Sequence, residues 1–296
     1  MRAKRTDLAL EAKELWQQSA GETTQLSGVK ATECQRMGYT VTTVEILDDE
    51  GEQELGKPRG KYVTIDLGNS RRRSPDGFER AINVLAGELK TLLQLDKKDS
   101  VLVVGLGNSA ITPDAIGPKT LESTMITRHL TERLPQYFGT MRRVSAIAPG
   151  VLGTTGLESA EVVRGVVQRS GPDRIIVVDA LAAASAKRLC CTVQLADTGI
   201  TPGSGVGNSR AAFNRETLGV PVIAIGVPTV LDAWTLEADV AERLGVQLPD
   251  AEQEPLIVTP KDIDAGVREL SSLVGYGINL ALHDQFDMED VTVFLS

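Results

Sequence analysis

Short apolar runs alternate with longer amphipathic segments along most of this chain, and this alternation is the strongest constraint on its fold. Seven segments are predicted to be strands because they are β-branched or alternate apolar with polar residues: 40–47, 62–67, 101–105, 143–148, 174–179, 189–195 and 220–226. Apolar residues at helical spacing predict five helices: 77–95, 113–134, 157–169, 231–244 and 262–282. Strands that alternate with helices favour an α/β fold, with a mostly parallel central sheet flanked by helices.

The chain shows no internal repeat and no low-complexity linker. Its 296 residues, 42% of them hydrophobic, supply enough apolar material for one large core, so we expect a single domain over residues 1–296. Residues 198–215 (TGITPGSGVGNSRAAFNR) are polar and rich in glycine, which predicts a long loop. Loops of this length inside a compact domain are usually functional or mobile.

Charge and apolar content exclude several classes of protein. The formal net charge is −9, and no run of basic residues is interleaved with aromatic ones, so we expect no nucleic-acid partner. No apolar stretch approaches the roughly 18 residues of a membrane span, and the charged start MRAKRTDLALEAKELW lacks the apolar centre of a signal peptide. Three cysteines, Cys34 and the neighbours Cys190 and Cys191, favour a reducing cytoplasm without a disulfide framework.

A nucleotide site is one interpretation of GLGNSA, which begins at Gly105 and fits the pattern G-x-G-x-x-G/A. Its surroundings do not favour this interpretation. Thr112-Pro113-Asp114 places a carboxylate where the phosphates of a dinucleotide would lie, and the next strand does not end in an acid that could bind the ribose.

Acidic residues at two predicted strand ends favour acid–base chemistry instead. Asp114 follows the strand 101–105, and Asp179 ends the apolar run RIIVVD. Reactive groups of open parallel sheets gather at the carboxyl ends of the strands, so both carboxylates are expected in one crevice. Two carboxylates about 3 Å apart share one proton, which lets one act as a base toward water while the other polarises a carbonyl. The alternatives are a helix-start acid for Asp114 and a loop cap for Asp179.

Further residues are candidates for contact with a substrate. Asn108 lies in GLGN, and Asp197 is a third strand-end acid that rivals either aspartate. The glycine-rich loop adds Gly203, Gly205, Gly207 and Asn208, where the backbone can approach a ligand closely. The two histidines, His129 and His283, have charged neighbours and are predicted to be surface residues. Without HExxH or CxxC motifs, no metal site and no cofactor are predicted.

Several ordered segments resemble one family over nearly the whole chain. They are RTDLALEA from Arg5, GLGN and TPDAIGP between Gly105 and Pro118, APGVLGTTG from Ala148, VVDALAA from Val177, DTGITPGSGVGN from Asp197, GVPVIAIGVPTVLDA from Gly219, and LIVTPKDID from Leu256. On these residues the chain resembles the germination protease of spore-forming bacteria, an endopeptidase that degrades small acid-soluble spore proteins. The resemblance implies a fold like that of the hydrogenase maturation proteases (phosphorylase/hydrolase-like), a homotetramer, and a location in the cytoplasm of the spore core.

The resemblance also implies residue roles. Asp114 and Asp179 match the two proposed catalytic aspartates, and the family is made as a zymogen that is shortened ahead of a segment like Thr6-Asp7-Leu8-Ala9. Only Met1–Arg5 precede Thr6, which implies either a reduced propeptide or numbering that begins near the mature end. A basic residue is expected near Ala184 but is missing. The segment from Leu8 to Trp16 is either a helix that covers the crevice or an ordinary packed helix.

Two other classes of function stay open at this point. One is a maturation-type endopeptidase that senses a bound metal through Asp114 and neighbouring acids. The other is a non-catalytic oligomeric α/β binding protein. Activity that depends on added nickel or another divalent ion would favour the first, and a purified protein that cleaves no spore protein even after N-terminal trimming would favour the second.

Overall fold

A computed structural model describes residues 5–20, 26–68, 74–207, 210–246 and 256–296. Its strands form one sheet in the order β1-β2-β3-β7-β8-β6-β4-β5, and β9 pairs with β8. The strands are β1 (Val29–Arg36), β2 (Tyr39–Ile46), β3 (Gly60–Asp66), β4 (Val101–Gly105), β5 (Val144–Ile147), β6 (Arg174–Ala182), β7 (Thr192–Ala196), β8 (Val222–Asp232) and β9 (Ile257–Val258).

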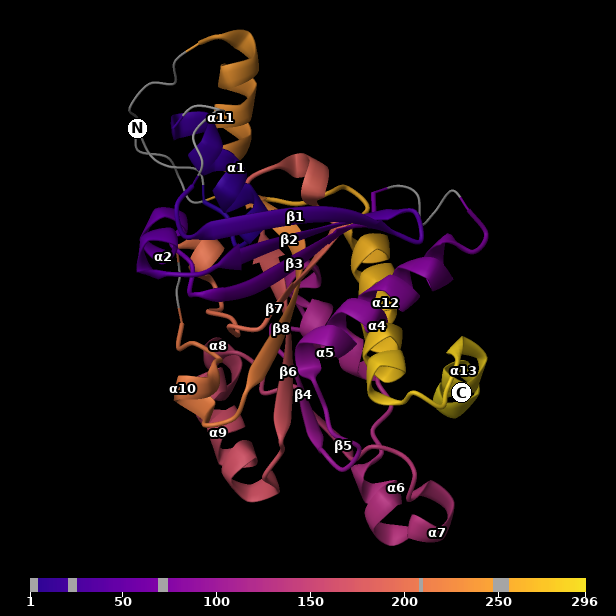
Figure 1. The fold of residues 1–296 in the computed structure, drawn as a ribbon. Coiled ribbons are helices and arrows are strands. Elements are labelled where there is room, and N and C mark those ends of the chain that lie inside the picture. The colour runs from indigo at the N-terminus through magenta and orange to yellow at the C-terminus, as the bar shows by residue number, and fades with distance from the viewer. Residues whose placement is uncertain (1–4, 21–25, 69–73, 208–209, 247–255) are drawn as a thin grey trace.

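Helices lie on both sides of this sheet (Figure 1). They are α1 (Ala9–Ala20), α2 (Asp49–Leu55), α4 (Gly77–Leu93), α5 (Ile116–Glu122), α6 (Arg128–Arg133), α7 (Pro135–Phe138), α8 (Leu152–Thr155), α9 (Ser159–Ser170), α10 (Arg215–Leu218), α11 (Ala233–Leu244), α12 (Ile263–Leu282) and α13 (Met288–Leu295), with short 3-10 turns η1 (Thr112–Asp114), η2 (Ala186–Arg188) and η3 (Ser204–Val206). The predicted α/β fold with flanking helices is confirmed.

The parallel part of the sheet is smaller than the sequence suggests. Strands β5, β4, β6 and β8 run parallel to one another. β7 pairs with β8 in the antiparallel sense, and β3, β2 and β1 continue the sheet antiparallel from there. Strand β1 was not predicted because nearly all its residues are exposed, so this edge strand carries no apolar pattern.

The predicted helix 113–134 is broken into η1, α5 and α6. Tertiary hydrogen bonds replace helical ones at the break. The amide of Met125 donates to Oδ1 of Asn279 in α12 at 2.8 Å, and the amide of Thr127 donates to the carbonyl oxygen of Val144 in β5 at 3.1 Å. These partners are distant in sequence, so apolar spacing alone does not reveal the break.

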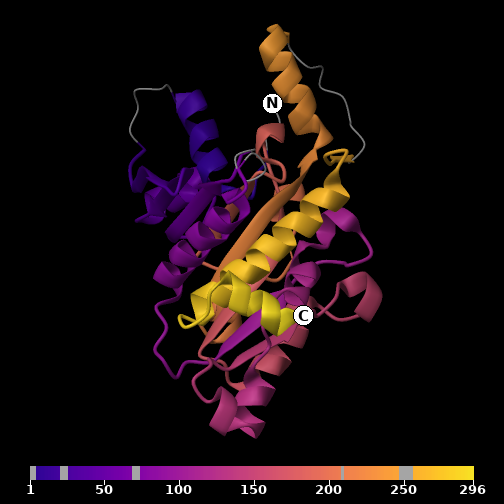
Figure 2. The ribbon, with the colours of Figure 1, turned by 90° about the vertical axis from the view of Figure 1, so that its right-hand side faces the viewer.

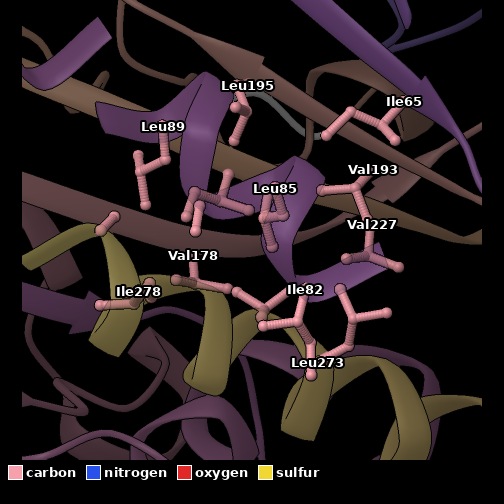
Figure 3. Close-up of a cluster of buried hydrophobic side chains, with 14 of the residues drawn as sticks. Ile65, Ile82, Leu85, Leu89, Val178, Val193, Leu195, Val227, Leu273 and Ile278 are labelled. Atoms are coloured by element: carbon pink, nitrogen blue, oxygen red, sulfur yellow. The ribbon is translucent and has the colours of Figure 1, made fainter. Parts of the chain in front are cut away.

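The central strands are apolar on both faces, because helices cover both faces of the sheet. On β4, Val101 and Val103 belong to the cluster with α4 and α12, whereas Leu102 and Val104 pack with α9. Figure 2 shows α12 running across its face of the sheet. Figure 3 shows leucines and isoleucines of α4 and α12 meeting the sheet residues Val178, Val193 and Val227.

Truncating a side chain of this core should destabilise the folded protein. Leu89 of α4 is fully buried, so Leu89→Ala is expected to lower the free energy of unfolding by about 2–5 kcal/mol through lost burial and the cavity left behind. Urea denaturation measures this change. Leu47→Ala is the control, because Leu47 is 56% exposed and surface changes usually stay within about 0.5 kcal/mol. Equal losses in the two variants would contradict the packing described.

Several side-chain predictions can be compared directly with the structure. All three cysteines are free, and His129 is exposed, as predicted. The prediction for His283 was wrong. This residue caps the C-terminus of α12, is only 1% exposed, and its burial lowers its pKa to about 4. Among the described residues, no helix is both long and apolar enough to cross a membrane.

Candidate active site

Asp179 lies where the parallel strands approach their carboxyl ends. Gly105 of β4 pairs with Val178 of β6, and Asp179 pairs with Gly226 of β8. Asp179 is buried, with 5% of the residue exposed, and its Oδ1 accepts a hydrogen bond from the amide of Ala180 at 2.9 Å. Strand β6 therefore carries a carboxyl group into the interior with one local donor.

Asp114 comes to the same place because α5 packs unusually close to the strand ends. A Cβ built on Gly117 would lie 2.2 Å from the carbonyl oxygen of Leu106 and 2.6 Å from that of Val178. A Cβ on Gly105 would lie 2.4 Å from the carbonyl oxygen of Gly117. A Cβ atom cannot approach backbone atoms this closely. Glycine at both positions therefore lets the backbone of α5 contact β4 and β6 directly.

The η1 turn that carries Asp114 is held on several sides. The amide of Asn108 donates to Oδ2 of Asp114 at 2.7 Å. Gly107 has a φ of 108°, and a Cβ there would lie 1.9 Å from the Asp114 carbonyl oxygen. The hydroxyl of Thr229 in β8 donates to the carbonyl oxygen of Pro113 at 2.7 Å. These contacts place the carboxyl group of Asp114 relative to the segment after β4 and to β8.

Both aspartates line one cavity of about 620 Å³. Its walls are largely apolar side chains from distant parts of the chain, including Leu106, Ile111, Leu152, Leu181, Phe213, Val230 and Ile257. A salt bridge of 3.6 Å joins Arg210 and Glu158, which also line it. A volume of this size lies within the range of ligand-binding clefts.

The surroundings raise the pKa of both aspartates. Burial raises the pKa of Asp114, although the hydrogen bond from the Asn108 amide acts in the opposite sense. Burial raises the pKa of Asp179 well above its ordinary value, and the charge of Asp114 raises it further. In the described part of the chain, neither carboxylate forms a salt bridge. Asp179 therefore retains a proton to higher pH than an ordinary carboxyl group.

The structure brings some of the predicted substrate-binding residues to this cavity. Asn108 and Gly203 line it. Gly205 is buried against Asp7, and a Cβ on Gly207 would meet the guanidinium of Arg5 at 2.1 Å. Asn208 lies outside the described residues.

Asp197 does not join the other two aspartates. It follows β7, which runs antiparallel to β8, so it lies toward the opposite end of the sheet. Its Oδ1 accepts the amide of Lys61 at 2.7 Å, and its side chain is exposed. The sequence of a strand does not reveal its direction, so Asp197 resembles the other strand-end acids although it lies elsewhere.

Other lining residues were missed by sequence reasoning. Residues 151–153 and 158–160 line the cavity from α8 and the start of α9, and Asp7 lines it from the N-terminal segment. The segment APGVLGTTG follows β5, another parallel strand, and a position after a parallel strand could have indicated that this segment borders the site. Asp7 had no such signal because it precedes every strand.

The first helix is packed rather than placed over the crevice. Ala9, with partly buried residues of α1, joins a cluster with Val44, Leu55 and Tyr62.

Although Ala184 stands where a basic residue was expected, Arg188 brings a guanidinium to this region and pairs with Glu11 at 3.4 Å and Glu14 at 2.7 Å.

Comparison with known proteins identifies the family of this chain. The family model described as "Germination protease" matches residues 9–248. The chain belongs to the germination protease family. A germination protease from Caldanaerobacter subterraneus subsp. tengcongensis is 44% identical over 94% of this chain and 94% of its own length. One from Clostridium tetani is 40% identical over 99% of each chain. The resemblance noted in the sequence is confirmed, and the chain is a peptidase by family.

Among solved structures, a [NiFe] hydrogenase maturation protease, HycI from Thermococcus kodakarensis KOD1, aligns with 64% of this chain and 98% of its own. The sequence identity is 18% and the TM-score is 0.35, too low to support any inference about the site. Within the described residues, no three or more His, Cys, Asp or Glu side chains are placed to hold a metal ion.

Proposed function

We propose that this protein is an endopeptidase that hydrolyses peptide bonds with Asp114 and Asp179 as an acid–base pair. One observation carries the proposal: the two carboxyl groups line the same largely apolar cavity, and the charge of one raises the pKa of the other. Two interacting carboxyl groups with unequal surroundings divide acid and base roles between them.

The surroundings also suggest which aspartate takes each role. Asp114 is partly exposed and its ionised form is stabilised by the Asn108 amide, so it is the carboxylate that accepts a proton. Asp179 is the more deeply buried and has the more strongly raised pKa, so it is the carboxylic acid. The pair still titrates as a unit, and these assignments describe its singly protonated state.

Hydrolysis then follows from one water molecule and one shared proton. Asp114 takes a proton from water as the water oxygen bonds to the scissile carbonyl carbon, while Asp179 gives its proton to the carbonyl oxygen. The resulting diol collapses when Asp114 returns a proton to the amide nitrogen and the C–N bond breaks. Asp179 recovers its proton from a diol hydroxyl, so both groups end as they began.

Family membership supports finer proposals. We propose small acid-soluble spore proteins as substrates, within the core of the spore, and a homotetrameric enzyme that is made as a zymogen. The sequence resemblance supports each of these. Gly203 of the glycine-rich loop and Asn108, which both line the cavity, are proposed to contact the substrate backbone.

A pH profile of cleavage tests this proposal. With a purified small spore protein as substrate, kcat/KM is expected to fall as pH rises through the raised pKa of Asp179, because the second carboxyl group then loses the shared proton. Gel electrophoresis of the products measures the rate, and the mature N-terminus should be confirmed beforehand by mass spectrometry. No cleavage at any pH by the trimmed, folded protein would reject the peptidase proposal.

A further inference from the structure

The strand β5 forms one border of the sheet, beside the parallel strands that carry the site. Among the described strands it pairs only with β4, in the parallel sense. No strand in this part of the chain lies along its other side (Figure 1). Backbone groups that face this outer side are therefore able to pair with another extended segment.

The hydrogen bonds at the start of β5 show which of its residues face outward. The amide of Val101 in β4 donates to the carbonyl oxygen of Arg143 at 2.9 Å, so Arg143 faces β4. Val144 faces the other way, because its amide donates to Oγ1 of Thr127 at 3.0 Å and its carbonyl oxygen accepts from the Thr127 amide at 3.1 Å. The first outward-facing residue of this edge is thus already paired, by the segment before α6.

The next outward-facing residues are Ala146 and Ala148, because the direction of the backbone groups alternates along a strand. No hydrogen bond within the described residues joins the amide or carbonyl oxygen of either alanine to a side chain or loop. Ala148 is exposed and Ala146 is half-buried. Their two N–H and two C=O groups are the pattern that an extended peptide needs in order to add as a further strand.

This edge leads directly to the cavity of the two aspartates. Residues 151–153 follow β5 after a short connection and line the cavity, as does Ser159. The hydroxyl of Ser159 donates to the carbonyl oxygen of Gly150 at 2.7 Å, which fixes the connection to the start of α9. Leu152 is 38% exposed although it lines the cavity, so it is accessible to a side chain of a bound peptide. The edge of β5 therefore continues onto the rim of the cavity.

We propose that the outer edge of β5 docks an extended segment of the substrate protein, which pairs with Ala146 and Ala148 and continues over residues 151–153 into the cavity. This inference rests on the proposed peptidase function and extends it to the binding of the substrate. Backbone pairing supplies affinity for the docked segment. Because backbone groups inside a folded domain are already paired, the site takes protein substrates that are unfolded around the cleaved bond.

The opposite border of the sheet, β1, supplies a matched comparison. It lies at the far end of the strand order. The amide of Leu47 donates to the carbonyl oxygen of Gly28 at 2.8 Å, so the register makes Lys30 bond with β2 and Ala31 face outward. Ala31 is exposed, and no residue of β1 lines the cavity. Ala31 therefore presents an outward amide like that of Ala146, but on an edge remote from the site.

Ala146→Pro tests the proposal, because it removes one outward amide at a position where edge strands tolerate proline. KM for cleavage of a small spore protein is expected to rise about 5–10-fold, as for the loss of one hydrogen bond, with kcat unchanged. A four-residue peptide around the cleaved bond spans only about 13 Å when extended, so the variant should cleave it as the wild type does. Ala31→Pro is the control and should leave KM unchanged for both substrates.

Amide hydrogen exchange tests the docking without cleavage. The Asp114→Asn variant, which is expected to bind substrate without cleaving it, is mixed with an excess of the spore protein. Mass spectrometry should then show slower exchange of the two free amides in the segment 144–148 than in the free protein. The segment 29–36 of β1 should exchange equally in both samples.

Three results would overturn the proposal. One is equal KM values for the spore protein in Ala146→Pro and Ala31→Pro. Another is equal exchange of residues 144–148 with and without the spore protein, which decides the matter even if Ala146→Pro does not fold. The third is slow exchange in the free protein, which would mean that another copy of the chain covers this edge. A wild type that cleaves neither substrate would instead reject the peptidase function, and the exchange result would still report on docking.

Discussion

Asp179→Asn is expected to lower kcat/KM for peptide-bond cleavage by about 10²–10⁴-fold while leaving the fold intact. The amide has nearly the shape of the protonated carboxyl group and can still accept the hydrogen bond from Ala180. It cannot release a proton to the scissile carbonyl oxygen. Single-turnover cleavage of a small spore protein measures the loss, and circular dichroism checks the fold.

The same change should make the protein more stable at neutral pH. The pKa of Asp179 is raised in the folded state above the ordinary value of 3.8. The stability that this raised pKa contributes is fully present below pH 3.8, where Asp179 is protonated in both the folded and the unfolded chain. It decreases above that pH, because the unfolded chain loses this proton first, and it is lost once the pH passes the pKa of the folded state. Asparagine never ionises, so the variant avoids this loss. Its Tm should exceed that of the wild type at pH 7 and match it at low pH.

Asp114→Asn is the companion variant, and it should lose activity to a similar extent because it lacks the base. Asp197→Asn is the control, since Asp197 is exposed and lies outside the cavity. It should retain near-normal turnover. Near-normal activity in either Asp114→Asn or Asp179→Asn would refute the paired mechanism, and a lower Tm of Asp179→Asn at pH 7 would contradict the raised pKa.

Gly117→Ala is expected to have the second-largest effect, lowering both the stability of the fold and the rate of cleavage. The added Cβ would meet the backbone nitrogen and carbonyl oxygen of Leu106 at 2.4 and 2.2 Å, and backbone cannot move aside as a flexible side chain can. Helix α5 must therefore shift away from β4 and β6, and it carries the η1 turn of Asp114 with it. Overpacking of this kind costs about 1–3 kcal/mol, and a displacement near 1 Å at a catalytic group can cost about 10²-fold in rate.

Gly87→Ala provides the matched control for this glycine. Gly87 lies within α4, and a Cβ there would meet nothing within 4 Å. Alanine should stabilise this helix by about 0.5–1 kcal/mol and leave kcat/KM unchanged. Urea denaturation and the cleavage assay report the two quantities. If Gly117→Ala were as stable and as active as Gly87→Ala, the close packing of α5 would not be what positions Asp114.

Features that depend on neighbouring residues were predictable from the sequence. The apolar runs before Gly105 and Asp179 indicated buried parallel strands, and the acids that follow them indicated where a site would form. The structure places Asp114 and Asp179 in one cavity, as that pattern predicts. Both inferences use the rule that parallel strands end at one edge of a sheet, so strand order was not needed.

Features that depend on direction and distant partners were decided only by the tertiary structure. Asp197 looks like the other strand-end acids, yet β7 runs antiparallel and carries it away from the site. Asp7 reaches the cavity only because the chain start is hydrogen-bonded to Ala182, and His283 is buried although its neighbours in sequence are charged. Local patterns record which residues avoid water, but the direction of a strand and the partner of a buried polar group follow from contacts between segments far apart in the chain.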